Sequence, residues 1–331
     1  MTIPSRGLYH KRVLVTGGCG FIGSHFINHI SKNPLQVWNL DKLTYAADPS
    51  NVEQHLDYRL LHGDVCNAFD VQSAVRASEP HFIVHFAAET HVDRSIDDSR
   101  EFMRTNVLGA DTMMSYARGC PDLELFIYIS TDEVYGPSKS ASDAKLETDP
   151  MAPSSPYAAS KAGADLLARA YFRTHNLPVA VVRPTNNYGP RQFPEKVIPV
   201  FTTNALEGRS LPLYSKGDNK REWLYVDDCV RAIEYVLLKG RGGESYNVGS
   251  GVYTSNRRLA KDILGVLGKP QKLIKSVPDR PGHDFMYAVD STKIRGLGWK
   301  PVTSFKTGLM DTVNWYKNNS TWWKQRKDKL K

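Results

Sequence analysis

The chain has 331 residues, of which 41% are hydrophobic and 24% are charged, and this ordinary globular composition excludes an intrinsically disordered protein. The net charge is +8, but part of it lies in the segment 324–331, which we interpret as a solvated basic tail, and no basic motif elsewhere predicts nucleic-acid binding. Because the four cysteines are far apart and no segment is apolar enough for a leader or a membrane span, we expect a cytoplasmic protein without zinc, disulfides or a membrane partner.

The first predicted unit is a strand, a glycine-rich turn and a helix. Val13–Thr16 has the composition of a buried parallel strand, and the turn Gly17–Gly23 opens an amphipathic helix that continues through Ile30. Glycines at positions 17, 20 and 23 allow a tight turn, close approach of a pyrophosphate and close packing of the helix on the sheet. The alternative is that the glycines serve only the turn. The surrounding strand and helix favour a dinucleotide site.

A second predicted strand, Val37–Asp41, ends in an acidic residue 18 positions after Gly23. A carboxylate at this place accepts hydrogen bonds from the adenosine ribose, which favours NAD over its 2′-phosphorylated form. Lys42, the next residue, weakens this preference.

Two further strands follow, each with a polar or small residue at its end. Tyr58–Val65 contains Asp64, a candidate acceptor for the adenine amino group, and His81–Ala88 ends in two alanines that allow close approach of a dinucleotide. His81 and His85 are four positions apart on a strand without an evident third ligand. We therefore interpret them as core or edge histidines rather than metal ligands.

Strands and helices alternate through Leu125–Ile129 and Val179–Arg183. This alternation predicts an α/β fold with a Rossmann-type, doubly wound parallel sheet and helices on both faces. We expect an NAD-binding domain over residues 1–185 and a smaller α/β substrate-binding region over residues 186–331, interleaved with the first domain.

The strand that ends at Ile129 continues into two hydroxyls and two adjacent carboxylates, Ser130-Thr-Asp-Glu133. Open α/β proteins bind ligands at the carboxyl edge of the sheet, so this stretch is a candidate active-site edge. The alternative is that these residues only cap the next helix.

A long irregular segment, 137–156, is a candidate lid or substrate loop, and a plain surface excursion is equally consistent with its composition. The helix after it carries Tyr157 and Lys161, which are four positions apart and therefore project from one face. A lysine ammonium beside a tyrosine is expected to lower the tyrosine pKa from its ordinary value of about 10. An ordinary exposed pair on a helix is the alternative.

The second half of the chain has cationic and amide side chains at predicted strand and loop ends, with aromatic residues between them. This composition suits a pocket for a nucleoside diphosphate. The relevant segments are 193–199, 211–214, 220–225, 245–249 and 279–284.

Taken together, Thr16–Gly23, Ser130-Thr131 and the Tyr157/Lys161 pair resemble the extended short-chain dehydrogenase/reductase superfamily. Ser-Thr-Asp-Glu-Val-Tyr-Gly at 130–136 is similar to the nucleotide-sugar 4,6-dehydratases that act on dTDP-glucose or UDP-glucose. The likeness extends from Val13 to about Trp315. It implies an NAD-dependent lyase that forms a 4-keto-6-deoxy sugar nucleotide and water, and a homodimer.

The resemblance also implies a role for each catalytic residue. Tyr157, supported by Lys161, would take the proton of the sugar 4-hydroxyl, and Thr131 would hydrogen-bond the same oxygen. Glu133 would remove the proton on carbon 5, while Asp132 would protonate the departing 6-hydroxyl. This division of labour requires environments that separate the pKa values of the two carboxyls.

Further positions are carried over from the resemblance. The implied cofactor contacts are Gly17, Gly20, Phe21, Ile22, Gly23, Asp41, Lys42, Thr44, Asp64, Val65, Ala87, Ala88, Thr90, Ser130, Tyr157 and Lys161. The implied substrate contacts are Asn186, Lys196, Val197, Pro212, Tyr214, Arg221, Asn247, Arg280 and His283.

Two other functions stay open from the sequence. A nucleotide-sugar 4-epimerase would use the Tyr157/Lys161 pair but would not need Asp132 and Glu133. A non-catalytic NAD-sensing protein of the same fold would need none of these four residues. Between dTDP-glucose and UDP-glucose the sequence favours dTDP-glucose only slightly.

Overall fold

The larger half of the molecule is built on one parallel sheet. The computed structural model describes residues 6–214, 216–279 and 284–329. Within these residues seven strands pair in the order β10-β6-β5-β4-β1-β2-β3, and every pair is parallel. Their bounds are Arg12–Thr16 (β1), Gln36–Asp41 (β2), Tyr58–His62 (β3), Phe82–His85 (β4), Leu125–Ile129 (β5), Val179–Pro184 (β6) and Ser245–Val248 (β10). The predicted doubly wound α/β fold is confirmed.

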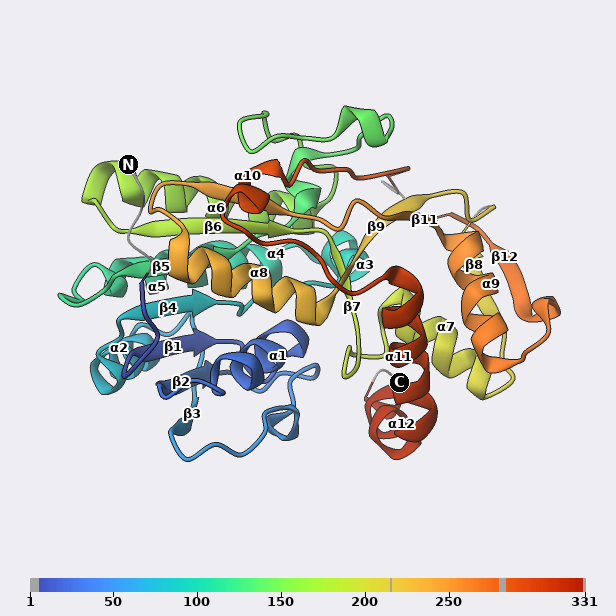
Figure 1. Ribbon diagram of the computed structural model, residues 1–331, viewed down its shortest axis with the longest axis horizontal. Coiled ribbons are helices and arrows are strands. Elements are labelled where there is room, and N and C mark those ends of the chain that lie inside the picture. The colour runs from blue at the N-terminus through green and yellow to red at the C-terminus, as the bar shows by residue number, and fades with distance from the viewer. Residues whose placement is uncertain (1–5, 215, 280–283, 330–331) are drawn as a thin grey trace.

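Helices cover both faces of this sheet (Figure 1). Because successive residues of a strand point to opposite faces, Val13 and Val15 pack with α1 and α8, whereas Leu14 packs with α2, α5 and α6. Burial on both faces explains why the strands are almost continuously apolar. The helices are α1 (Phe21–Ile30), α2 (Ala68–Ser78), α3 (Val92–Asp97), α4 (Arg100–Phe102), the π-helix η2 (Met103–Leu108), α5 (Gly109–Ala117), α6 (Pro156–His175), α8 (Val226–Lys239) and α10 (Thr292–Gly296).

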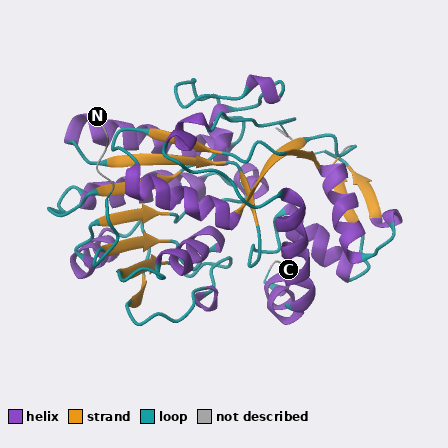
Figure 2. Cartoon of the chain, viewed as in Figure 1, coloured by secondary structure: helices purple, strands orange, loops and turns teal. Residues whose placement is uncertain are grey.

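The smaller half has its own apolar core between short strands and helices (Figure 2). In the described part of the chain, one sheet has the order β11-β9-β7 and a second pairs β12 with β8. The strands are β7 (Asn186–Tyr188), β8 (Leu211–Tyr214), β9 (Lys220–Tyr225), β11 (Tyr253–Ser255) and β12 (Ile274–Val277). The helices are α7 (Val197–Leu206), α9 (Asn256–Leu267), α11 (Phe305–Asn318) and α12 (Ser320–Asp328), with short 3₁₀ turns η1 (Pro49–Asn51), η3 (Asp132–Tyr135), η4 (Ala141–Asp143) and η5 (Gln271–Leu273).

The chain passes between the two halves more than once. After β9 it returns to the large sheet as α8 and β10, leaves again for β11 and α9, and comes back once more at α10. The predicted boundary between two domains at residue 185 stays a prediction.

The segment 137–156 packs along the chain near residue 288, in the green part at the top of Figure 1. Lys145 donates its backbone N–H to the carbonyl of Ala288 at 2.9 Å, and the N–H of Asp290 donates back to Lys145 at 2.9 Å. None of residues 137–156 is among those that line the large cavity described below. In this structure the segment is therefore a surface excursion that does not border the cavity.

The basic tail is also different from the prediction. Residues 320–328 form α12, in which Trp323 and Arg326 are buried, and Arg326 pairs with Asp48 in the larger half. Within the predicted tail, Arg326 is therefore packed through the stem of its side chain rather than solvated, whereas Lys324, Gln325 and Asp328 are exposed as expected. Among the described helices, none combines the length and apolar character required to cross a bilayer.

We expect Trp323→Ala to lower the free energy of unfolding by about 3 kcal/mol, because it leaves a cavity beneath α12. Gln325→Ala, at an exposed position of the same helix, is the control and should change it by less than about 0.5 kcal/mol. Urea denaturation measures both. Equal effects of the two changes would show that α12 does not pack as described.

Candidate functional site

One large cavity crosses the carboxyl edge of the parallel sheet and continues into the smaller half. Its volume is about 590 Å³. It begins at the turn after β1 and the ends of β2 and β4, passes η3 and α6, and reaches β8 and β9. The sheet order reverses between β1 and β4, and such a switch point is where open α/β sheets bind ligands.

The cavity collects nearly all the residues predicted from the sequence. Every predicted catalytic and cofactor residue lines it, from Gly17 to Lys161. Of the predicted substrate residues, those that line it are Asn186, Lys196, Val197, Pro212, Tyr214 and Arg221.

The glycine-rich turn packs so tightly on itself and against the residues after β4 that side chains are excluded at Gly17 and Gly23. Gly17 has φ +70°, and a Cβ there would lie 2.7 Å from the backbone nitrogen of Ala87. A Cβ on Gly23 would lie 2.4 Å from the carbonyl oxygen of Gly17. Helix α1 then starts at Phe21 without a side-chain cap. Its first N–H groups therefore lie at the cavity, in an arrangement that suits a phosphate group.

Asp41 lies at the end of β2 and is buried. Its two oxygens accept the backbone N–H groups of Cys19 and Leu43, each at 2.8 Å. Burial raises the pKa of Asp41, and these two hydrogen bonds oppose the shift. Because each carboxylate oxygen can accept more than one hydrogen bond, capacity remains for a ribose hydroxyl.

Lys42 has carboxylate partners of its own. Its ammonium lies 3.0 Å from Asp64 and 3.7 Å from Glu101, and the hydrogen bond with Asp64 raises the pKa of Lys42. The positive charge that weakened the preference for NAD is thus matched by acidic side chains, which disfavour a 2′-phosphate at this end of the cavity.

The Ser130–Glu133 stretch serves as a cap and also lines the cavity. The Thr131 hydroxyl accepts the Glu133 N–H at 3.3 Å and so caps η3, as the alternative interpretation proposed. It also donates to Asp132 Oδ1 at 3.2 Å. Capping therefore accounts for Thr131 but not for the two carboxyls that line the cavity.

Asp132 is almost completely buried, and its Oδ2 has no hydrogen-bond partner in the described part of the chain. Burial raises the pKa of Asp132 well above its ordinary value, and the charges of Glu133 and Glu222 add to the shift. This environment favours the protonated form of the carboxyl, which can act as an acid.

Tyr157 and Lys161 lie on one face of α6, which begins with Ser155 as its N-cap. The Lys161 ammonium donates to the carbonyl of Ile129 at 2.5 Å and lies 4.6 Å from the centre of the Tyr128 ring. Burial lowers the pKa of Lys161 to about 7, although Asp165 opposes the shift.

The pKa of Tyr157 differs from the sequence-based expectation. Burial raises it, the charge of Glu133 raises it further, and a hydrogen bond with Thr131 opposes both. The expected lowering by Lys161 is absent from the described site, because Lys161 is itself buried and directs its ammonium to Ile129.

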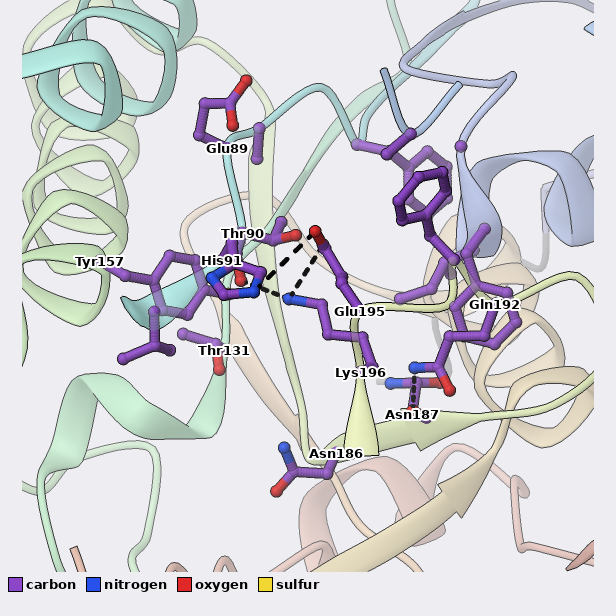
Figure 3. A pocket seen from close by; sticks show the side chains of 18 of the residues that line it. Glu89, Thr90, His91, Thr131, Tyr157, Asn186, Asn187, Gln192, Glu195 and Lys196 are labelled. Carbon is purple, nitrogen blue, oxygen red and sulfur yellow. Dashed lines mark hydrogen bonds and ion pairs between the residues drawn. The ribbon is translucent and has the colours of Figure 1, made fainter. Parts of the chain in front are cut away.

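The middle of the cavity contains a cluster of charged residues between the two halves, shown in Figure 3. The Lys196 ammonium donates to the carbonyl of Thr90 at 2.7 Å and lies 3.7 Å from Glu195. Glu195 also lies 3.9 Å from His91 and accepts the Tyr45 hydroxyl at 3.0 Å. These contacts hold the loop before α7 against the loop after β4.

Arg221 lies on β9 at the far end of the cavity. Its guanidinium donates to the carbonyls of Asp284 and Phe285 at 3.1 and 3.3 Å and lies 4.8 Å from the centre of the Tyr287 ring. Arg221 is thus a buried cation held by this segment, and it lines the cavity together with Pro212 and Tyr214.

Three of the predicted substrate residues need separate mention. Asn247 does not line the cavity: its amide accepts the Tyr135 hydroxyl and donates to the Lys145 carbonyl, both at 2.8 Å. It is fully buried in the large sheet, so its prediction as a substrate contact is wrong. Arg280 and His283 lie outside the described residues.

Several cavity residues were missed by the sequence reasoning. Asn256, the first residue of α9, lines the cavity, and its Oδ1 is buried without a hydrogen-bond partner among the described residues. The sequence pattern that could have indicated Asn256 is an amide side chain directly after Ser255, the N-cap residue at the end of a strand. Among the other missed residues, the polar and aromatic side chains include His91, Gln192, Glu195 and Tyr287, which carry no comparable local pattern.

We expect Asp132→Asn to raise the free energy of unfolding at pH 7. The folded-state pKa of Asp132 is raised, so stability falls as the pH rises from the unfolded-state pKa of about 4, while the folded protein keeps the proton. The difference between variant and wild type should therefore grow from pH 4 to 7 by at most about 1.4 kcal/mol per pH unit. Urea denaturation at several pH values measures it.

Asp57→Asn, at an exposed position, is the control for the loss of a carboxylate. A stability difference for Asp132→Asn that stays constant over this pH range would contradict a protonated Asp132.

Comparison with known proteins places the chain among enzymes of sugar nucleotides. Residues 14–312 match the family model described as GDP-mannose 4,6 dehydratase. The chain is 48% identical to a dTDP-glucose 4,6-dehydratase of Streptomyces niveus and 43% identical to one of Neisseria meningitidis serogroup B, with 96% and 95% of both chains covered, respectively.

Solved structures agree with this relationship. A crystal structure of DesIV, a dTDP-glucose 4,6-dehydratase from Streptomyces venezuelae with NAD and TYD bound, has a TM-score of 0.91 and 46% identity, covering 95% of this chain and 99% of the other. A UDP-glucose 4-epimerase of Thermus thermophilus in complex with NAD has a TM-score of 0.87 and 29% identity, covering 93% and 99%. The chain belongs to the GDP-mannose 4,6 dehydratase family, within the extended short-chain dehydrogenase/reductases.

Proposed function

We propose that the protein is an NAD-dependent nucleotide-sugar 4,6-dehydratase that converts dTDP-glucose to the 4-keto-6-deoxy sugar nucleotide and water. The observation that carries the proposal is Asp132, a buried carboxyl whose pKa is raised, next to Glu133 in the cavity that also contains Tyr157. The dTDP-glucose 4,6-dehydratases to which the chain is similar support the choice of nucleotide.

The cavity fits NAD at the glycine-rich turn. The turn carries no side chain at Gly17, Gly20 or Gly23, the N-terminus of α1 offers N–H groups, and Asp41 retains acceptor capacity. When bound there, NAD would take up the hydride from carbon 4 of the sugar and return it to carbon 6. Gly17, Gly20 and Gly23 would border its pyrophosphate.

Tyr157 would take the proton of the sugar 4-hydroxyl, and Thr131 would hydrogen-bond the same oxygen. Since burial raises the pKa of Tyr157, its ionised form depends on positive charge close by. Lys161, with a pKa of about 7, is poised to supply this charge or to give up its proton in the neutral range.

Water elimination would then use the two adjacent carboxyls in opposite senses. A ketone at carbon 4 acidifies the proton on carbon 5, which Glu133 would remove. Asp132 would give its proton to the 6-hydroxyl, which leaves as water. Glu133 would return its proton to carbon 5 when the double bond is reduced. The raised pKa of Asp132 supports its role as the acid in this scheme.

The nucleoside diphosphate would lie in the smaller half. Lys196, Arg221 and Asn186 supply the cation and amide groups that a diphosphate needs, and Pro212 and Tyr214 would flank the base. Val197 borders the same region. Arg280 and His283, predicted from the family resemblance, remain candidates for this end of the substrate.

A 4-epimerase would leave the buried acid without a task, since epimerisation exchanges hydride only at carbon 4. Similarity to an epimerase of 29% identity supports a shared fold and cofactor site. We therefore favour the dehydratase, and galactose formation in the experiment below would reverse this choice.

Incubation with dTDP-glucose should yield a product with the alkaline ultraviolet absorbance of a 4-keto-6-deoxy sugar, at a higher kcat/KM than with UDP-glucose. Glu133→Gln and Asp132→Asn should each lower its rate of formation about 10²–10⁴-fold, because each removes one proton-transfer group. Asp57→Asn is the matched control and should leave the rate unchanged. The reaction scheme is wrong if both active-site variants release water at the wild-type rate. Tight NAD binding without turnover by the wild-type protein would favour a non-catalytic NAD-sensing protein.

We also propose a cytoplasmic homodimer. Cys19, Cys66, Cys120 and Cys229 are free thiols, which suits a reducing compartment. Leu108 on η2 and Leu166 on α6 are 59% and 54% exposed, although these two helices pack against each other. Large apolar side chains exposed together are typical of an interface.

We expect Leu108→Arg combined with Leu166→Arg to convert the dimer to a monomer, because two charges would enter an apolar interface. Light scattering after size-exclusion chromatography measures the mass. Leu56→Arg, at a leucine that is fully exposed elsewhere, is the control and should leave the dimer intact. A wild-type protein that is monomeric would contradict the proposal directly.

A further inference from the structure

A buried polar cluster lies behind the catalytic residues, outside the cavity. Arg183 on β6 and Asp165 on α6 form a two-fold ion pair: Nε donates to Oδ2 and Nη2 donates to Oδ1, each at 2.8 Å. Both side chains have no exposed surface. Neither residue lines the cavity or has a part in the proposed chemistry.

Tyr135 joins this pair to the sheet. Its hydroxyl accepts a hydrogen bond from Nη1 of Arg183 and donates one to Asn247 Oδ1 at 2.8 Å. The guanidinium also lies 5.0 Å from the centre of the Tyr135 ring. Burial raises the pKa of Tyr135 to about 12, so the hydroxyl keeps the proton that it donates to Asn247.

The cluster connects the two segments that carry the proposed catalytic groups. Tyr135 is the last residue of η3, the same short helix that contains Asp132 and Glu133. Asp165 follows Lys161 by one turn of α6 and Tyr157 by two turns. Helix α6 and strand β6, which carry the ion pair, are neighbours in Figure 1. Thus one set of hydrogen bonds spans η3, α6 and the sheet.

The energetics favour a role in geometry over one in stability. A buried ion pair loses solvation that its attraction barely offsets, and apolar residues of similar size would often stabilise a protein as well. Directional hydrogen bonds, in contrast, define the relative placement of the groups they join. Catalysis is sensitive to such placement at the scale of about 1 Å.

We propose that Tyr135, Arg183 and Asp165 are positioning residues, which hold Asp132 and Glu133 at the correct distance from Tyr157 for water elimination. This inference rests on the proposed dehydratase function. It assigns a task to the tyrosine of the Asp-Glu-Val-Tyr stretch that the reaction scheme itself leaves unused.

The test is Tyr135→Phe, which removes only the shared hydroxyl and keeps the ring. Because η3 loses its hydrogen bonds to the cluster while α6 keeps the Arg183–Asp165 pair, elimination should slow relative to oxidation at carbon 4. We expect kcat with dTDP-glucose to fall about tenfold with KM within about twofold. The isotope effect on kcat from deuterium at carbon 5 should rise above the wild-type value, and that from deuterium at carbon 4 should fall.

Tyr171→Phe is the matched control. Tyr171 is also on α6, and its hydroxyl donates to Asp111 at 2.7 Å, away from the cluster. This change should cost comparable stability in urea denaturation and leave kcat and both isotope effects unchanged. Asn247→Ser removes the other partner of the Tyr135 hydroxyl, and as a second variant it should reproduce the isotope pattern of Tyr135→Phe.

Wild-type isotope effects in folded Tyr135→Phe and Asn247→Ser would overturn the inference, as would an equal loss of kcat in Tyr171→Phe. If the wild-type protein forms no keto sugar from either nucleotide sugar, the proposed function fails instead, and the two failures are therefore distinguishable.

Discussion

Loss of solvation at the carboxyl edge of the sheet is the constraint on which the site depends. Asp132, Tyr157 and Lys161 are all buried, and burial is the largest cause of the pKa shift of each. The two acids keep their protons more firmly and the lysine holds its proton less firmly than in water. This common environment suits a reaction in which protons move between substrate and protein at neutral pH.

Hydrogen bonds then give each of these buried ionisable side chains a different environment. Lys161 is directed to the Ile129 carbonyl, and Thr131 hydrogen-bonds to Tyr157, Asp132 and the backbone N–H of Glu133. Behind them, the fully buried Arg183–Asp165 pair connects β6 with α6, and Tyr135 joins η3 to this pair. This edge of the cavity is thus supported by buried hydrogen bonds on the side of the sheet, while the opposite side is open to ligands.

The relationship with epimerases shows where specificity arises in this fold. A UDP-glucose 4-epimerase shares the architecture at a TM-score of 0.87, so the sheet and the glycine-rich turn serve more than one reaction. The feature that favours a dehydratase is local, a buried acid next to a second carboxyl at the end of β5. The path of the chain, which returns from the smaller half at α8, β10 and α10, keeps both ends of the cavity in one continuous structure.

The sequence by itself determined the parallel sheet, the glycine-rich turn, and the Tyr157/Lys161 and Asp132/Glu133 pairs. Strands and helices show in the spacing of apolar residues, and the motifs show in residue types at fixed short spacing. It could not determine that Asn247 bonds to Tyr135, 112 positions away, or that Arg326 is buried in the basic tail. It also predicted a lowered pKa for Tyr157, whereas burial raises it. Solvation and long-range pairing depend on which distant segments meet, and only the tertiary structure decides that.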